Sequence, residues 1–251
     1  MRAHPLATRT LAAASAVALI TGAARAQELP AAADLAARHR ATVNADALAQ
    51  RSSMHTVGRF SIPSAGVSGR FESWSARPDR SAIHISLPNV GDIRSGFSEG
   101  IAWSLNPMEG PRVLSGNELA QAADDAAFDA MLRPEGRVAS MTTVELTTLG
   151  ETACYKVRVE WKSGRESFDC YSPETGLRVG TVSSQESAMG RVEATTLYED
   201  YTSFDGFMLP TTIRIQVMGM EQVVSVDEVT FDTVPDSAFH RPAEITTLIG
   251  G

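Results

Sequence analysis

The two cysteines are the residues whose spacing most directly suggests a chemical bond. Cys154 and Cys170 each lie in a segment of alternating polar and apolar residues, and Ser163-Gly164 between them is typical of a turn. The two segments predict an antiparallel hairpin in which Cys154 faces Cys170. In that register Arg158 faces Glu166, which adds a favourable charge pair. In an oxidising compartment we therefore expect a disulfide bond, rather than two unrelated buried thiols.

Histidines do not form a recognisable metal-binding or catalytic motif. The sequence contains no H-E-x-x-H, no glycine-rich phosphate loop and no C-x-x-C. Beyond the first 26 residues none of the histidines lies within five residues of another: His39, His55, His84 and His240. His84 lies between Ile83 and Ile85, which is more typical of a solvent-facing strand residue than of a metal ligand. We expect no metal and no cofactor.

Carboxylates are numerous, but neighbouring pairs are expected to point apart. Asp124-Asp125 lies in a predicted helix, where adjacent side chains are about 100 degrees apart. Glu199-Asp200 and Asp227-Glu228 lie in predicted strands, where neighbours face opposite sides. A glycosidase needs two carboxylates that converge across a cleft, and the sequence identifies no such pair. We therefore predict no catalytic residues, and a protein that is not an enzyme.

Large apolar side chains are the remaining candidates for a functional role. Trp, Phe and flexible Met side chains fall on predicted strands and on their connecting loops. Most should pack the core, but a large concave sheet with few helices leaves room for an apolar ligand. Trp103 alternates with Ile101 and Leu105, and its alternative role is that of a core residue packed on the second predicted helix. The residues predicted to bind the ligand are Trp103, Phe71, Phe97, Ile101 and Leu119.

Two helices are predicted from the apolar periodicity and from start and stop signals. The first spans about Ala31–Gln50. The second spans Ser115–Leu132, where Ser115 and Glu118 have the spacing of a capping box and Arg133–Gly136 ends the helix. The apolar face of the first helix is expected to comprise Leu35, His39, Val43 and Leu48.

The rest of the chain alternates with period two and predicts about eleven strands. Gly, Pro, Ser, Asn or Asp separate the cysteine hairpin and the other expected strands, which are Met54–Ile62, Val67–Ala76, Ser81–Leu87, Ile93–Glu99, Ile101–Leu105, Thr142–Leu149, Leu177–Ser183, Arg191–Tyr201, Leu209–Val217 and Val223–Phe231. An antiparallel sheet with one apolar face needs a cover, and two helices are available for it. We predict an α+β fold, a strongly curved antiparallel sheet that forms an open half-barrel with two covering helices.

Composition and charge exclude several classes of protein. The chain has 251 residues, of which 43% are hydrophobic and 21% charged, as in ordinary globular domains. The formal net charge is -8 and no cluster of Lys and Arg is present, which argues against nucleic acid as a partner. No run of eighteen apolar residues occurs, so we expect no transmembrane segment.

The first 26 residues have the features of a secretory signal peptide. Arg2 and Arg9 precede the apolar run Leu11–Ile20, and the segment ends in the small-residue pattern Ala24–Ala26. The apolar run is too short to span a membrane, and no Cys follows it to carry a lipid anchor. We expect residues 1–26 to be removed, and residues 27–251 to form a single domain in the periplasm or another extracytoplasmic compartment.

Several stretches resemble the periplasmic outer-membrane lipoprotein carriers, the LolA/LolB-like family. After the Ala-rich helix and a first strand that opens with Ser53–Gly58, the chain has Gly96–Pro107 and Gly110–Leu119. Tyr198–Thr211 and the closing Val234–Pro242 resemble the late strands and the final turn of such proteins. The resemblance implies an open, half-closed antiparallel barrel, whose helices form a lid over a hydrophobic concavity that receives acyl chains.

This resemblance implies binding rather than catalysis. Shielding a lipid chain from water is worth about 0.8 kcal/mol per CH₂ and needs no covalent chemistry. We therefore expect an exported binding protein that holds an acyl chain, a lipid or the lipid moiety of a lipoprotein, with outer-membrane lipoprotein sorting as its specific role. The alternative is an extracytoplasmic sensor or scaffold domain that binds a protein partner of the envelope.

Overall fold

The computed structural model describes Met1 and residues 28–187 and 190–250, so the predicted signal peptide lies outside the described residues. The helices are α1 (Ala32–Thr42), α2 (Ala45–Ala49), α3 (Gly116–Asp125) and α4 (Ala243–Gly250), with short 3-10 turns η1 (Pro63–Ala65), η2 (Ala130–Leu132) and η3 (Asp236–Phe239). The strands are β1 (Ser53–Ile62), β2 (Val67–Ala76), β3 (Arg80–Leu87), β4 (Gly91–Ser98), β5 (Ile101–Asn106), β6 (Gly110–Val113), β7 (Val138–Leu149), β8 (Thr152–Trp161), β9 (Glu166–Tyr171), β10 (Arg178–Ser187), β11 (Gly190–Phe204), β12 (Phe207–Val217) and β13 (Met220–Phe231).

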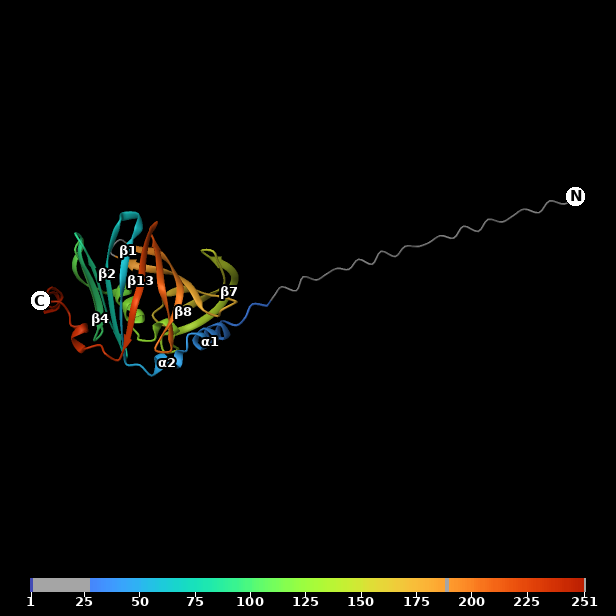
Figure 1. Ribbon diagram of the computed structural model, residues 1–251, viewed down its shortest axis with the longest axis horizontal. Coiled ribbons are helices and arrows are strands. Elements are labelled where there is room, and N and C mark those ends of the chain that lie inside the picture. Colours follow the sequence, from blue (N-terminus) through green and yellow to red (C-terminus); the bar gives the residue numbers. More distant parts are fainter. Residues whose placement is uncertain (2–27, 188–189, 251) are drawn as a thin grey trace.

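The strands of the described residues form one antiparallel sheet of 13 strands, in the order β6-β5-β4-β3-β2-β1-β13-β12-β11-β10-β9-β8-β7. Two meanders, β1 to β6 and β7 to β13, are joined where β1 pairs with β13. The sheet stays open, because β6 and β7 are its two edges. It curves strongly, with α1 and α2 at one end of the strands (Figure 1). The predicted α+β half-barrel with covering helices is confirmed.

The core beside the candidate site lies where the N-terminal helices meet the middle of the sheet. The predicted apolar face of the first helix is confirmed, since Leu35, His39, Val43 and Leu48 are all buried. The predicted single helix is nevertheless two, because Asn44 adopts a left-handed conformation with φ 56° between α1 and α2. The buried core cluster here comprises Val43, Leu48, Phe128, Phe207, Leu209, Val229 and Phe231.

The second predicted helix ends earlier than expected, and its capping box is wrong. Regular helix covers Gly116–Asp125, and η2 follows separately. Ser115 is the N-cap residue, but its side chain makes no capping hydrogen bond. The carboxylate of Glu118 instead accepts a hydrogen bond from Arg112 Nη2 at 2.8 Å. A charged guanidinium is a stronger donor than the backbone N–H that a capping box would offer.

Two further elements were absent from the sequence prediction. The first is the edge strand β6, which contains Pro111. Proline has no backbone N–H to donate to a neighbouring strand, so it is tolerated at the edge of a sheet but not in a central strand. The second is α4, which follows the last strand and contacts β6. Both lie toward the β6 edge of the sheet, away from the first helices.

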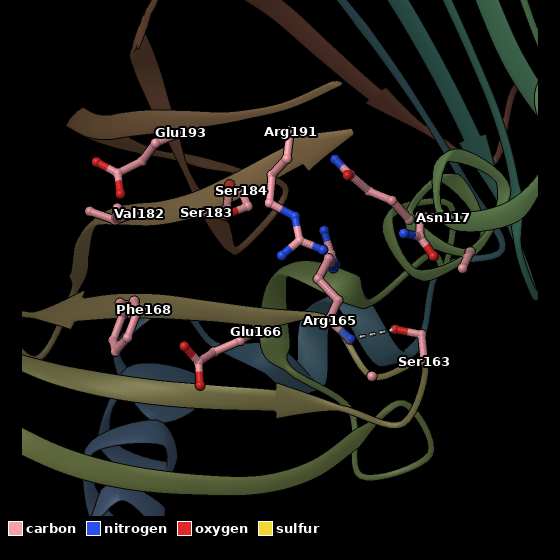
Figure 2. A pocket seen from close by; sticks show the side chains of 13 residues that line it. Asn117, Ser163, Arg165, Glu166, Phe168, Val182, Ser183, Ser184, Arg191 and Glu193 are labelled. Atoms are coloured by element: carbon pink, nitrogen blue, oxygen red, sulfur yellow. Dashed lines mark hydrogen bonds between the residues drawn. The ribbon is translucent and has the colours of Figure 1, made fainter. Parts of the chain in front are cut away.

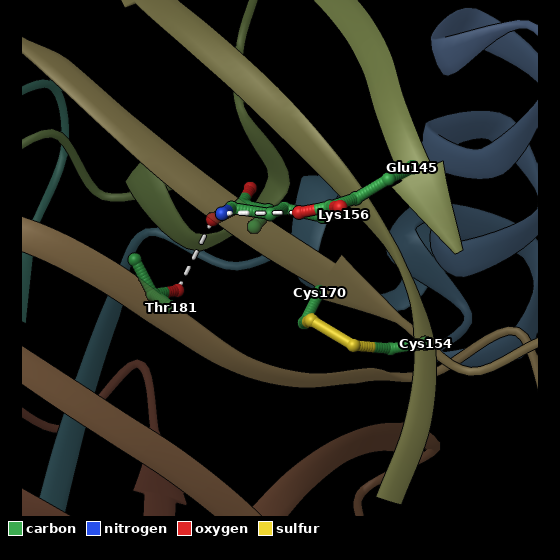
Figure 3. The surroundings of a disulfide bond; sticks show 6 residues. Glu145, Cys154, Lys156, Cys170 and Thr181 are labelled. Atoms are coloured by element: carbon green, nitrogen blue, oxygen red, sulfur yellow. Dashed lines mark hydrogen bonds and ion pairs between the residues drawn. A yellow bond between two sulfur atoms is a disulfide. The ribbon is translucent and has the colours of Figure 1, made fainter. Parts of the chain in front are cut away.

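The structure confirms the disulfide between Cys154 and Cys170, whose Cα atoms are 5.3 Å apart (Figure 3). The predicted register of the hairpin is wrong, however, because Lys156 rather than Cys154 faces Cys170 and Glu160 faces Glu166. A shift of two residues keeps every side chain on the same face, so alternation could not detect it. The length of the turn between the strands decides the register instead.

Candidate functional site

A cavity of about 240 Å³ lies between the curved sheet and the N-terminal helices. Its walls come from β1, β2 and β10 to β13, together with α1 and η2. The apolar side chains that line it are Val43, Met54, Phe71, Met131, Leu132, Phe207, Met208, Leu209, Pro210, Ile213, Val226 and Val229. The lining is therefore dominated by aliphatic and aromatic groups, as expected of a small-molecule site.

Two irregularities in the strands bring extra side chains to this cavity. In β13 a bulge at Asp227 separates Val226 from Glu228 in the pairing with β1, so Val226 and Val229 both line the cavity. In β11 the left-handed Asp200, with φ 55°, lies between Tyr198 and Tyr201, and both tyrosines line the cavity. Regular alternation would have placed the two members of each pair on opposite faces.

Arg178 is the charged side chain of the cavity lining, and it is almost completely buried, with 7% of its side chain exposed. Its Nη1 donates a hydrogen bond to the Met131 carbonyl at 2.8 Å and lies 3.6 Å from Asp169 Oδ2. Its guanidinium carbon lies 5.0 Å from the ring centre of Tyr198. Its buried Nε has no hydrogen-bond partner among the residues that the structure describes. A donor of this kind is costly to bury unless something accepts from it.

Asp169 is fully buried next to Arg178, but its main hydrogen-bond partner is a different arginine, Arg133. Arg133 donates from Nε and Nη2 to the two Asp169 oxygens at 2.7 and 2.6 Å. Thr181 and Tyr171 donate further hydrogen bonds at 3.1 and 3.2 Å. Burial alone raises the pKa of the Asp169 carboxyl, but the charges of Arg133 and Arg178 outweigh it and hold that pKa below its usual range. Asp169 is therefore a carboxylate at neutral pH.

His39 completes the polar end of the cavity as a neutral group. Its Nδ1 accepts a hydrogen bond from the Arg178 backbone N–H at 3.2 Å. Burial, and then the charge of Arg178, lower the pKa of His39 to about 3. The buried cluster therefore holds two positive charges, from Arg133 and Arg178, and one negative charge from Asp169.

A second hollow, of about 250 Å³, is polar and lies beside α3 (Figure 2). Arg165 and Arg191 extend into it together with Glu166 and Glu193. Arg165 donates to Asp125 at 2.9 Å and lies 3.6 Å from Asp124. Positive and negative groups alternate around this hollow, so its charges are largely compensated. The apolar cavity is the stronger candidate for a ligand site.

Of the five residues predicted to bind a ligand, Phe71 lines the apolar cavity. Phe97 and Leu119 lie elsewhere, in a cluster that packs α3 on β4 and β5. Trp103 is 4% exposed and lies over Gly96 on the neighbouring strand, and Ile101 begins the same strand β5. These four residues are not in the cavity lining. The cover of the cavity is formed by α1 and η2 rather than by α3.

Sequence reasoning missed the polar residues of the site. In a regular strand, Arg178 would alternate with Gly180 and face away from Leu177 and Val179, which gives no hint of burial. A register irregularity after Arg178 in the pairing with β9 removes that alternation. His39 carried one signal, because it falls on the apolar face of the first helix.

The chemistry of hydrolases and metal sites finds little support in the geometry. Gly96–Gly100 has the G-x-S-x-G spacing of a nucleophile elbow, but it forms the β4–β5 hairpin, in which Ser98 pairs with Ile101. An elbow requires a turn from a strand into a helix. Within residues 28–187 and 190–250, no three His, Cys, Asp or Glu side chains are grouped to hold a metal ion. In the same residues, no helix has the length and apolar character needed to cross a membrane.

Comparisons with known proteins identify the fold. No model of a known family and no curated protein matches the sequence. Among solved structures, a LolA superfamily protein from Nitrosomonas europaea matches with a TM-score of 0.57 and 17% identity, over 85% of this chain and 99% of that one. A DUF1329 family protein from Desulfovibrio piger matches with a TM-score of 0.54 and 15% identity, over 82% and 97% of the two chains. A Vibrio parahaemolyticus domain described as an outer membrane lipoprotein-sorting protein matches with a TM-score of 0.50 and 10% identity, over 82% and 97%. The resemblance found in the sequence is thus confirmed at the level of structure: this chain has the LolA-like fold.

Proposed function

We propose that this chain is an exported binding protein that holds an acyl chain or a similar apolar ligand in the cavity beneath α1 and η2. The observation that carries the proposal is the apolar lining of this cavity, which brings together β1, β2, β12 and β13. Each CH₂ group transferred from water into such a lining contributes about 0.8 kcal/mol. Binding of this kind requires no catalytic group.

The size of the cavity favours a single chain. Its volume of about 240 Å³ is below the range of roughly 300–1,000 Å³ that is common for small-molecule pockets. A ligand with several acyl chains would require α1 or η2 to move away from the sheet. We therefore propose a ligand with one chain, and we keep lipoprotein sorting as a more specific hypothesis. That hypothesis is supported only by the fold and by the description of the Vibrio parahaemolyticus domain.

The remaining parts of the proposal concern the whole chain. We propose that residues 1–26 direct export, that residues 27–251 act as one domain, and that the protein works in the periplasm or a comparable compartment. Phe71 is the predicted ligand residue that we retain as a contact. We assign Phe97 and Leu119 to the contact between the sheet and α3, and Trp103 and Ile101 to strand β5 outside the cavity.

Blocking the cavity tests the proposal. Ile213 is a partly buried wall residue of β12, so Ile213→Trp should fill the space that the ligand needs. Gln216→Trp adds the same side chain at an exposed position of the same strand and is the matched control. Titration with the uncharged fluorescent probe N-phenyl-1-naphthylamine should show at least a tenfold weaker affinity for Ile213→Trp, and an unchanged affinity for Gln216→Trp.

Two results would count against the proposal. One is equal affinity of the folded Ile213→Trp variant and the unsubstituted protein for the probe. The other is native mass spectrometry of protein purified from its own envelope in which no lipid or other apolar molecule accompanies the chain. A protein partner that copurifies in place of a lipid would favour the sensor or scaffold alternative.

A further inference from the structure

Arg178 places a positive charge at the cavity, and a purely apolar chain would offer this charge no partner. We propose that the ligand is a single-chain amphiphile with a singly charged acidic head, a carboxylate, and that this head pairs with Arg178 while the chain lies along the apolar wall. This inference rests on the proposed function, and it names the chemical class of the ligand.

The first argument is the unpartnered donor. The Arg178 side chain is more than nine-tenths buried and lines the cavity, yet its Nε–H donates to no atom of residues 28–187 and 190–250. Buried polar groups in folded proteins nearly always have a partner. The other hydrogen bond of this guanidinium goes to the Met131 carbonyl on the cover. An acceptor inside the cavity would satisfy the remaining donor.

The second argument is the balance of charge. Asp169 is the carboxylate that interacts with Arg178, and it is already held at two points by Arg133. Two tyrosines also contact Arg178, since its guanidinium lies over the Tyr198 ring at 5.0 Å and the Tyr201 hydroxyl donates to its carbonyl at 2.8 Å, but both are neutral groups. His39 is neutral, so among the described residues one positive charge remains without a full partner. A buried charge is costly unless it is paired, and one negative charge would complete the set.

The third argument is the direction of the cavity. In the order of the sheet, β10 with Arg178 and β2 with Phe71 are the outermost strands that line it. The strands between them contribute Ile213, Leu209 and Val226. A ligand with its head at Arg178 and its chain toward Phe71 would match both ends. A singly charged carboxylate matches the one excess charge better than a phosphate monoester, which carries about -1.5 to -2 at pH 7.

A set of ligands with the same chain tests this inference in the unsubstituted protein. Isothermal titration calorimetry at pH 7 would compare decanoate, decanol, decyl phosphate and decyltrimethylammonium. We expect decanoate to bind at least about tenfold more tightly than decanol, because only the carboxylate brings a negative charge to the guanidinium, whereas the decanol hydroxyl is a neutral acceptor. Decyl phosphate should bind more weakly than decanoate, and the cationic ligand most weakly of all.

Variants then assign the preference to Arg178. Arg178→Met should abolish the preference for decanoate over decanol. Arg214→Met is the matched control, because Arg214 lies on β12 outside the cavity lining and pairs with Glu199 and Glu221. If Arg178→Met does not fold, the ligand series in the unsubstituted protein decides the question alone.

Each outcome separates the inference from the proposed function. Equal affinities for decanoate and decanol would overturn the acidic head and leave the proposed function standing. A preference that persists in folded Arg178→Met would overturn the role of this residue. Tightest binding of decyl phosphate would overturn the carboxylate and identify a phosphate head. Failure of every ligand to bind would overturn the proposed function itself.

Discussion

The apolar cavity and the polar hollow have nearly the same volume, about 240 and 250 Å³, but their arginines differ in the carboxylates that they face. Each contains an arginine whose buried Nε lacks a hydrogen-bond partner in the described part of the chain, Arg178 in the cavity and Arg165 in the hollow. Arg165 faces Asp124 and Asp125, whereas Arg178 shares the single Asp169 with Arg133. Charge balance, more than volume, therefore distinguishes the polar hollow from the cavity that we propose as the ligand site.

Removal of a carboxylate should have very different effects in the two regions. Asp169→Asn leaves two buried guanidiniums without a charged partner, and we expect a loss of about 3 to 5 kcal/mol in the free energy of unfolding. Asp125→Asn removes a carboxylate that is 55% exposed, and the expected loss is below about 1 kcal/mol. Urea unfolding at pH 7 measures both. Similar small losses in the two variants would show that the two buried arginines do not depend on Asp169 as their charged partner.

Trp103 lies in neither region, so its substitution should change the stability of the protein without changing ligand binding. It is 4% exposed and lies against Gly96, outside the cavity lining. We expect Trp103→Ala to reduce the free energy of unfolding by about 3 to 5 kcal/mol, because a large buried side chain is lost. At a temperature where the variant remains folded, its affinity for N-phenyl-1-naphthylamine should be unchanged. A clear loss of probe binding by the folded variant would return Trp103 to the ligand site.

The free energy of unfolding should depend on pH, because His39 at the cavity is neutral in the folded protein. Its pKa is about 3 in the folded protein, against about 6.5 in an unfolded chain. Between these values only the unfolded state binds the proton, so the free energy of unfolding falls as the pH is lowered, by up to about 1.4 kcal/mol per pH unit. Urea unfolding should therefore show a loss of about 1 to 2 kcal/mol between pH 7 and pH 5.

The matched variant for this measurement is His39→Gln, which keeps a hydrogen-bond acceptor near the Arg178 backbone but does not titrate. It should have a flatter dependence over the same pH range. An unchanged slope would mean that His39 is protonated within the fold.

Much of the fold could be predicted from local patterns, because they depend on residues close in sequence. Period-two alternation located most of the strands, and the burial of Leu35 and Leu48 followed from helical spacing. The disulfide was predicted although its register was not, since a shift of two residues preserves every face. Of the residues predicted to bind a ligand, Phe71 lines the cavity and Trp103 does not, because helical and strand spacing do not determine which face of the sheet the cavity occupies.

The sequence by itself determined an antiparallel meander with one apolar face, because alternation, turns and the spacing of two cysteines are properties of short segments. Only the tertiary structure decided where the buried charges meet. Arg133 reaches Asp169 across 36 residues of chain, and Arg178 comes from the next strand after a break in alternation. No local pattern distinguishes such an arginine from an exposed one, because its burial is decided by the partners that the folded sheet brings to it.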